Sequence, residues 1–133
     1  MAVDLMHRKY IIHRDIKPDN ILLMDRKDVK ICISDLGLAC LSTDEGETSL
    51  KCGTPGYVGP EVLKGASFTT KSDIFSIGSF FFNLLTNTNL FHGKNAKEML
   101  ILASSGLAGI SCLYDLMLLS SYLLTYAENI TFW

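Results

Sequence analysis

The 133-residue sequence lacks several features that mark common classes of protein. No C-x-x-C pair occurs among its cysteines, which argues against a zinc cluster and favours reduced thiols. The cysteines are Cys32, Cys40, Cys52 and Cys112. No excess of one charge exists either, because 12 basic and 14 acidic residues give a net charge of −2. We therefore expect neither a nucleic-acid partner nor binding to an anionic membrane surface.

The amino-terminal residues MAVDLMHRKY lack the uninterrupted apolar core of a secretory signal, since charged side chains interrupt them. We therefore expect a cytoplasmic protein, with the nucleus as the alternative location. A length of 133 residues is enough for one hydrophobic core. The chain is accordingly expected to be one domain or a piece of one.

Hydropathy patterns predict a small number of secondary-structure elements. Residues 21–24 and 29–33 are short apolar segments on either side of the polar turn DRKD, which predicts a β-hairpin. Residues 38–56 show no periodicity and are expected to form a long exposed loop. Residues 59–64 predict a short helix opened by a proline, and residues 71–87 predict a helix that is apolar almost all round. We expect this second helix to be buried on every side.

The stretch HRDIKPDN, residues 13–20, puts charged and amide side chains between two apolar segments. A polar loop whose Asp and Asn side chains bind backbone amides would explain each residue singly. The full spacing H-R-D-x-x-x-x-N, however, resembles the catalytic loop of eukaryotic protein kinases. Three further stretches resemble that family in the same order: SDLGLA at 34–39, CGTPGYVGPEV at 52–62 and KSDIFSIG at 71–78. They are similar to its magnesium-binding D-F-G segment, its substrate-docking loop with the A-P-E segment, and the start of its central helix.

The resemblance covers about residues 1–100 and implies the large lobe of the protein kinase fold. This lobe is α+β and mostly α-helical, with a short β-hairpin that carries the catalytic loop. The sequence departs from the family at Leu36, which stands for Phe, at Gly59, which stands for Ala, and at Phe75, which stands for Trp. Residues 101–133 are expected to be a divergent apolar tail.

Phosphoryl transfer depends mainly on positioning and charge neutralisation, and the matching residues can be given roles on that basis. Asp15 would orient the attacking hydroxyl and accept its proton, and Lys17 would place positive charge near the transferring phosphoryl group. Asn20 and Asp35, at the open ends of the hairpin, would bind Mg²⁺ and, together with Lys17, the phosphates of ATP. Asp35 could instead only cap the turn before Gly37.

Lys17 within DIKPDN and Thr54 within GTPGY resemble the serine/threonine branch of the family. In that branch the Thr54 hydroxyl would contact both Asp15 and Lys17 and complete the catalytic group, which also contains Asn20. The alternative is that Thr54 and Pro55 only form a turn. The resemblance implies a protein serine/threonine kinase that transfers the γ-phosphoryl group of Mg-ATP to Ser or Thr of a protein substrate.

Arg14, directly before the catalytic Asp, resembles the arginine with which related kinases bind a phosphate on the activation loop. Thr48 and Ser49 are the candidate phosphorylation sites by position. They could equally be ordinary hydroxyls of an exposed loop. Four further matches are expected to be structural: His13, Gly37, Glu61 and Asp73.

Two of these structural residues have specific expected contacts. Asp73 resembles an Asp that accepts hydrogen bonds from the catalytic-loop backbone, although an Asp in the first turn also stabilises a helix through its dipole. Glu61 resembles a Glu that pairs with an Arg late in the large lobe. The last Arg in this sequence is Arg26, so that ion pair is not expected.

The sequence contains no G-x-G-x-x-G loop, and no ATP-anchoring Lys precedes the catalytic loop at the distance the family requires. The resemblance therefore implies a large-lobe fragment without its small lobe, which we expect to be inactive alone. The alternatives are a non-catalytic kinase-like binding module and a residual product of a truncated gene.

Residues 107–124 are apolar enough to suggest a membrane span, but Asp115 at their middle would cost about 2.5–3.5 kcal/mol. We therefore do not expect a membrane partner. A terminal helix pair packed on the lobe, or residues that belong to no kinase core, are the two interpretations that stay open for this region.

Overall fold

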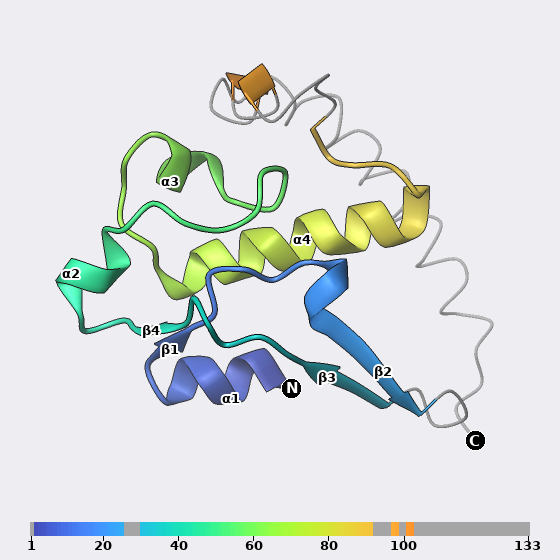
Figure 1. The fold of residues 1–133 in the computed structure, drawn as a ribbon, viewed down its shortest axis with the longest axis horizontal. Coiled ribbons are helices and arrows are strands. Elements are labelled where there is room, and N and C mark those ends of the chain that lie inside the picture. Colours follow the sequence, from blue (N-terminus) through green and yellow to red (C-terminus); the bar gives the residue numbers. More distant parts are fainter. Residues whose placement is uncertain (1, 26–29, 92–96, 99–100, 103–133) are drawn as a thin grey trace, which may run out of the picture.

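The computed structural model describes residues 2–25, 30–91, 97–98 and 101–102. Their elements in chain order are α1 (Ala2–Arg8), β1 (Ile11–Ile12), the 3-10 helix η1 (Pro18–Asn20), β2 (Ile21–Asp25), β3 (Lys30–Ile33), β4 (Cys40–Leu41), α2 (Glu45–Thr48), α3 (Pro60–Leu63) and α4 (Thr70–Thr86). Figure 1 shows α4 running through the middle of the molecule, with α1 and the strands on one side and α3 on the other. The described part of the chain is therefore a mixture of helices and strands, in which α4 is the longest element.

The described strands form two separate antiparallel pairs. Strand β2 pairs with β3, with Ile21 opposite Ile33, and this hairpin lies where the sequence predicts one. Strand β1 pairs with β4, with Ile12 opposite Cys40. The second pair was not predicted, because strands of two residues are too short to show a period of two in the sequence.

The segment 38–56 is more structured than the predicted exposed loop. It contains β4 and the single helical turn α2, whose N-cap Asp44 accepts a hydrogen bond from the Glu47 N–H at 3.0 Å. Thr48, at the end of α2, is buried, and its carbonyl accepts the N–H of Phe68 at 2.8 Å. The expectation of an exposed loop is therefore wrong at three buried residues, namely Cys40, Thr48 and Gly56. Long-range contacts hold them inside: Cys40 pairs with Ile12, and the carbonyls of Thr48 and Gly56 accept hydrogen bonds from Phe68 and Ser79.

Helix α4 has clear signals at both ends. Its N-terminus is a capping box, in which the Thr69 side chain accepts the N–H of Lys71 and the Ser72 hydroxyl accepts the N–H of Thr69. Its C-terminus is Asn87, a left-handed cap with φ of 54°. These caps place the helix within one residue of the predicted range 71–87.

The prediction that α4 is buried on every side is wrong. Its buried residues form one stripe, namely Ser72, Asp73, Ser76, Ser79 and Phe82. Four large apolar residues elsewhere on the helix are 44–62% exposed, namely Ile74, Phe81, Leu84 and Leu85. Most residues of the buried stripe are polar. Asp73, Ser76 and Ser79 bond to the backbone of neighbouring loops, so this face is the one that packs against the rest of the described chain. The apolar residues on the other faces are therefore left exposed.

A small apolar core joins the β1–β4 pair to α3 and to the loops before and after α3. Its members are Ile12, Cys40, Val58, Val62 and Phe68. Within the described residues the cysteines Cys32, Cys40 and Cys52 are free thiols. No helix in the described part of the chain is both long and apolar enough to cross a membrane. The candidate span at 107–124 and nearly all of the predicted tail lie outside the described residues.

Candidate active site

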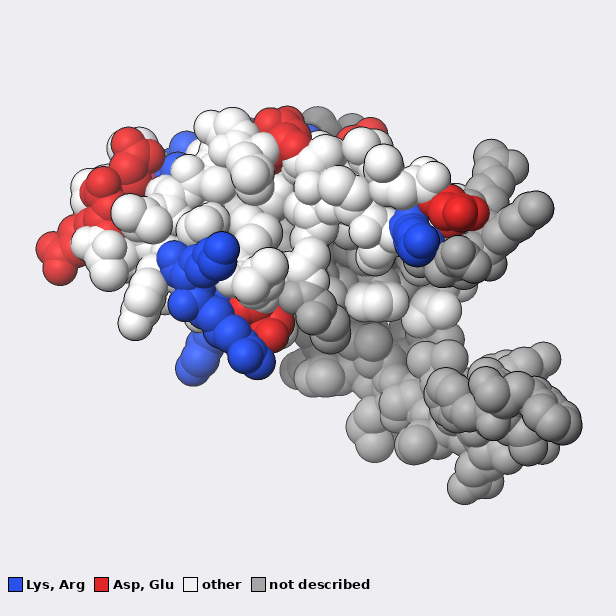
Figure 2. Space-filling view, turned by 90° about the horizontal axis from the view of Figure 1, so that it is seen from below, with Lys and Arg blue, Asp and Glu red and all other residues white. Residues whose placement is uncertain are grey.

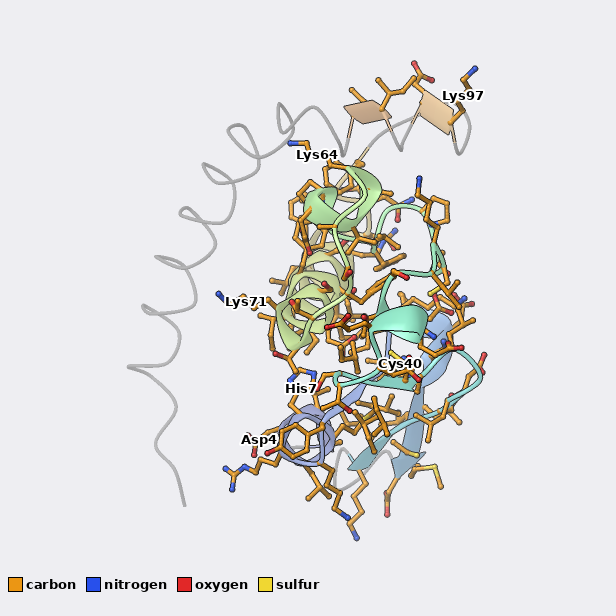
Figure 3. All side chains as sticks on the ribbon, turned by 90° about the vertical axis from the view of Figure 1, so that its left-hand side faces the viewer. Asp4, His7, Cys40, Lys64, Lys71 and Lys97 are labelled. Atoms are coloured by element: carbon orange, nitrogen blue, oxygen red, sulfur yellow. The ribbon has the colours of Figure 1, made fainter. Side chains whose placement is uncertain are left out.

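One buried carboxylate fixes residues 13–20 to α4. Asp73 has no exposed surface, and it accepts hydrogen bonds from the backbone N–H groups of His13 at 2.9 Å and Arg14 at 3.0 Å. The His7 side chain lies 2.8 Å from the same carboxylate, and Figure 3 shows it between α1 and α4. Arg14 has a left-handed φ of 69°, which is costly for a residue other than Gly. The two bonds to Asp73 hold the backbone in this conformation.

Asp15, Lys17 and Thr54 form a cluster of side chains in mutual contact. The Thr54 hydroxyl donates to one oxygen of the Asp15 carboxylate at 2.6 Å. The Lys17 ammonium lies 2.9 Å from the other carboxylate oxygen and donates to the Thr54 hydroxyl at 2.9 Å. The Asn20 amide donates to the Asp15 backbone oxygen at 2.9 Å and to its carboxylate at 3.2 Å. The structure thus brings together the four residues that the sequence predicts to be catalytic.

Burial and charge act on Asp15 in opposite directions. Burial raises the pKa of Asp15, but hydrogen bonds from Thr54, Lys17 and Asn20 and the charge of Lys17 outweigh it and lower the pKa below its ordinary value. The hydrogen bond with Asp15 also raises the pKa of Lys17, with a contribution from nearby carboxylates that include Asp35. Both members of the ion pair are therefore charged at neutral pH.

His13 links residues 13–20, called the catalytic loop below, to the end of strand β3 in the β2–β3 hairpin. It is completely buried, and its Nδ1 accepts the N–H of Asp15 at 3.3 Å. Its Nε2 lies 3.1 Å from the carbonyl oxygen of Ser34. An imidazole that carries its proton on Nε2 satisfies both contacts. His13 thereby sets the separation between Asp15 and the residue after Ser34, which is Asp35.

Asn20 and Asp35 lie at neighbouring ends of the hairpin. The Ser34 N–H donates to the Asn20 carbonyl at 2.8 Å, and the Ser34 hydroxyl contacts the same oxygen at 3.2 Å. Asp35 is exposed and has a left-handed φ of 59°, and its carboxylate accepts the N–H of Gly37 at 3.1 Å. Asp35 therefore makes the turn-capping contact that the sequence analysis considered, in a position beside Asn20.

The donor set of Asn20 and Asp35 suits Mg²⁺ bound together with phosphates. In the described part of the chain, no three His, Cys, Asp or Glu side chains converge on a metal-sized site. Mg²⁺ in phosphoryl-transfer sites usually takes one or two protein ligands and completes its shell with substrate phosphates and water. An amide oxygen and a carboxylate are hard donors of the required kind. The residues present therefore fit Mg²⁺ as the partner of a nucleotide.

The Arg14 guanidinium lies inside the loop 38–53 and contacts that loop at several points. Its Nε donates to the Leu38 carbonyl at 2.5 Å, and its terminal nitrogens donate to the backbone oxygen of Glu47 and, at 3.2 Å, to the Glu47 carboxylate. The guanidinium also lies 5.6 Å from the centre of the Phe68 ring. Sequence reasoning missed Glu47, because nothing in the segment DEGET distinguishes it from other solvated acids.

The two candidate phosphorylation sites do not contact Arg14 through their hydroxyl groups. The Thr48 hydroxyl donates to the Glu45 carbonyl at 3.3 Å, and the Ser49 hydroxyl donates to the Gly46 carbonyl at 2.8 Å. Both are local contacts, within α2 for Thr48 and at its C-cap for Ser49. Thr48 is buried, whereas Ser49 is exposed.

The docking loop, residues 52–62, is held on α4 by hydroxyl groups of the buried stripe. Ser76 donates to the Tyr57 carbonyl at 2.8 Å, and Ser79 donates to the Gly56 carbonyl at 2.7 Å. These bonds fix the backbone directly after Thr54. The sequence analysis did not single out these serines, although small polar residues three apart in an otherwise apolar helix are a usable signal.

Glu61 is tied to the start of α4 by a hydroxyl group. Its carboxylate accepts a hydrogen bond from Ser72 at 3.2 Å, and Ser72 also accepts the N–H of Thr69. A Cβ atom on Gly59 would overlap the Glu61 carboxylate. Gly59, at the position where the family that the sequence resembles has alanine, therefore leaves room for the Glu61 carboxylate next to the Gly59 backbone.

Known protein kinases are similar to this chain in sequence. The family model described as "Protein kinase domain" matches residues 1–119. Probable serine/threonine-protein kinase 2 of Plasmodium falciparum is 41% identical over 100 residues, which cover 74% of this chain and 19% of the relative. CBL-interacting serine/threonine-protein kinase 10 of Arabidopsis thaliana is 43% identical over 102 residues, with 74% and 21% covered.

Calcium/calmodulin-dependent protein kinase type 1 of Macrobrachium nipponense is 43% identical over 99 residues, which cover 74% of this chain and 28% of that relative. The chain thus spans between 19% and 28% of the length of these three relatives. The matched region of the family model includes every residue of the site described above.

Proposed function

Because the chain belongs to the protein kinase family, we propose that it forms the catalytic part of a protein serine/threonine kinase, the large lobe of the kinase fold. The reaction is transfer of the γ-phosphoryl group of Mg-ATP to a Ser or Thr hydroxyl of a protein substrate. The contact of Asp15, Lys17 and Thr54 is the observation that supports this proposal most strongly.

Asp15 orients the acceptor hydroxyl. A carboxylate has about four acceptor positions, and Thr54, Lys17 and Asn20 occupy three of them. One position is left on the oxygen that contacts Thr54, and the substrate hydroxyl can donate to it. The lowered pKa keeps Asp15 ionised but also makes it a weak base. Its main contribution is therefore to align the hydroxyl, and it takes the proton as the phosphoryl group is transferred.

Lys17 neutralises charge at the transferring group. Its side chain is 21% exposed, so the ammonium reaches the surface where a nucleotide would lie, while Asp15 and Thr54 hold it in one place. A fixed positive charge next to the developing negative charge stabilises the transition state more than a solvated one does. The raised pKa of Lys17 keeps this charge present throughout the neutral range.

Asn20 and Asp35 would hold Mg²⁺ on the phosphates of ATP. When bound, Mg²⁺ neutralises charge on the β- and γ-phosphates. Asn20 is held by its own bonds to Asp15, and Asp35 is held beside it through Ser34. The position of Asp15 and the positions of the metal donors therefore depend on each other through the hydrogen bonds of Asn20.

Phosphate transfer by the chain joined to a compatible small lobe tests the proposal against its main alternative. In this small-lobe fusion, the small lobe of one of the matching relatives is fused to the N-terminus of the chain. Incorporation of phosphate into a generic Ser/Thr protein substrate is then measured. Activity supports the kinase. A folded fusion that binds ATP but transfers no phosphate favours a kinase-like binding module.

A further inference from the structure

We propose that Glu47 is a positioning residue that holds the activation loop, residues 38–53, on the catalytic loop through Arg14, so that no loop phosphate is needed for this contact. The inference rests on the proposed kinase function and concerns the regulation of the same site. Its physical basis is a buried cation that already has a carboxylate partner in the loop.

The Arg14 guanidinium needs an acidic partner because of its burial. Its side chain is 4% exposed, whereas that of Glu47 is 50% exposed. A buried guanidinium without a counter-charge is strongly unfavourable. Glu47 supplies two acceptors to it, a backbone carbonyl and a carboxylate, and Leu38 supplies a third. A phosphate on the loop would have to displace a carboxylate that is already in place.

Arg14 contacts the loop at its entry, its middle and its exit. Leu38 is at the entry and Glu47 is in the middle. At the exit, a Cβ on Gly53 would lie 2.8 Å from the Arg14 carbonyl oxygen, so the loop passes directly over the Arg14 backbone. The next residue is Thr54, which bonds to Asp15. The Glu47 contact therefore helps to position Thr54, and through Thr54 the Asp15 carboxylate, because the loop backbone connects Glu47 to Thr54.

The hydroxyl groups of the loop are poorly placed to replace Glu47 by a phosphate. Thr48 is buried, and its carbonyl is bound by Phe68, so a phosphate on Thr48 would require α2 to move. Ser49 is exposed, but it lies only two residues after the acidic segment 44–47, and Figure 2 shows acidic side chains gathered over α2. A phosphate dianion at this place would be repelled by the carboxylates that are already there.

Amide hydrogen exchange across residues 38–53 tests the proposal in the small-lobe fusion after phosphatase treatment. Glu47→Gln is the test variant, and Glu45→Gln is the matched control because it removes an exposed charge from the same helical turn. We expect the wild-type loop to be protected without phosphate. Exchange in Glu47→Gln should be about 10-fold faster, the size expected for the loss of one charge-assisted contact. Glu45→Gln should match the wild type.

Kinetics and a double variant complete the test. Glu47→Gln should lower kcat and leave the KM for ATP unchanged. Added to Arg14→Ala, Glu47→Gln should change the loop exchange little further, because the guanidinium that the Glu47 carboxylate contacts is then already absent. Equal exchange in wild type and Glu47→Gln would overturn the proposal, as would loop protection that appears only after phosphorylation. If every fusion is inactive while the exchange differences are found, the kinase function fails and the Glu47 contact stands.

Discussion

Replacing Asp73 should strongly destabilise the chain. Its carboxylate is the acceptor for two backbone N–H groups, those of His13 and Arg14, and it also contacts the His7 side chain. Asp73→Ala would leave both buried N–H groups without this acceptor. A buried donor that loses its partner costs about 1–3 kcal/mol. Two such donors give about 2–6 kcal/mol, before any effect on His7 is counted.

This loss is large compared with the stability of a small domain, which is about 5–15 kcal/mol. Asp73→Asn is the milder change, because its amide keeps one acceptor oxygen for one of the two N–H groups. We expect it to cost about half as much, roughly 1–3 kcal/mol. The positive φ of Arg14 offsets part of this loss, since the strained backbone there would relax once it is released.

Urea unfolding of the chain at neutral pH, followed by far-ultraviolet circular dichroism, measures these differences. Asp4→Ala is the control, because the Asp4–Arg8 pair is a largely exposed ion pair at spacing i, i+4. Such a pair contributes about 0.3–0.5 kcal/mol. A free energy of unfolding for Asp73→Ala within about 0.5 kcal/mol of the wild type would refute this account of the catalytic loop, since two unpaired donors cost more.

Three further predictions concern the site itself. Thr54→Val removes a hydrogen bond that lowers the pKa of Asp15. The titration of the Asp15 carboxyl group, followed by NMR, should therefore move to higher pH. An unchanged midpoint would contradict the assigned contact. Asp35→Asn should weaken Mg²⁺-dependent nucleotide binding in calorimetry, whereas Asp15→Asn should leave that binding nearly intact; loss of binding in both would contradict the separate roles. Gly59→Ala should displace the Glu61 carboxylate and lower the thermal midpoint, although it introduces the residue that related kinases carry at this position.

Acid should weaken the fold through Asp15. The folded-state pKa of Asp15 lies below that of an unfolded chain, so its contribution to stability is present at neutral pH and is lost as pH falls through the folded-state pKa. The same contribution should be smaller in a variant without the Thr54 hydroxyl.

The contacts around Asp15 were expected because residues 13–20 and GTPGY resemble the protein kinase family, in which several groups meet in one volume. The hairpin was predictable from its local pattern, since residues 21–24 and 29–33 have strand-like hydropathy around a polar turn. The metal-binding roles proposed for Asn20 and Asp35 rest on their places at the two ends of that hairpin and on the resemblance to the kinase family. Only the hairpin itself follows from the order of residues and the geometry of one local element.

The buried face of α4 could not be read from hydropathy. The helix is apolar almost all round, so its pattern does not choose a face, and the face that is buried is rich in serine. What selects it is a set of bonds from Ser72, Ser76 and Ser79 to groups between 11 and 23 residues away. Such long-range pairing leaves no periodic signal in the sequence.

The partner of Arg14 was unpredictable for a related reason. The motif identifies Arg14 as a residue that contacts the activation loop, but the path of the loop decides which of its residues reaches the guanidinium. Thr48 and Ser49 are next to Glu47 in the chain, and only the turn of α2 directs Glu47 to Arg14. A shift of one residue in this turn would place a hydroxyl there.

Phosphate transfer by Asp15→Asn, compared with Asp4→Asn in the same small-lobe fusion, tests the central claim most directly. Both changes remove one carboxylate charge, but Asp4 lies on the exposed surface of α1, as Figure 3 shows. We expect Asp15→Asn to lower kcat by about 10²–10⁴-fold with ATP binding retained, the usual loss for a positioned acid–base group. Asp4→Asn should be as active as the wild type. A fusion in which Asp15→Asn transfers phosphate as fast as Asp4→Asn would contradict the assignment of this site as a kinase active site.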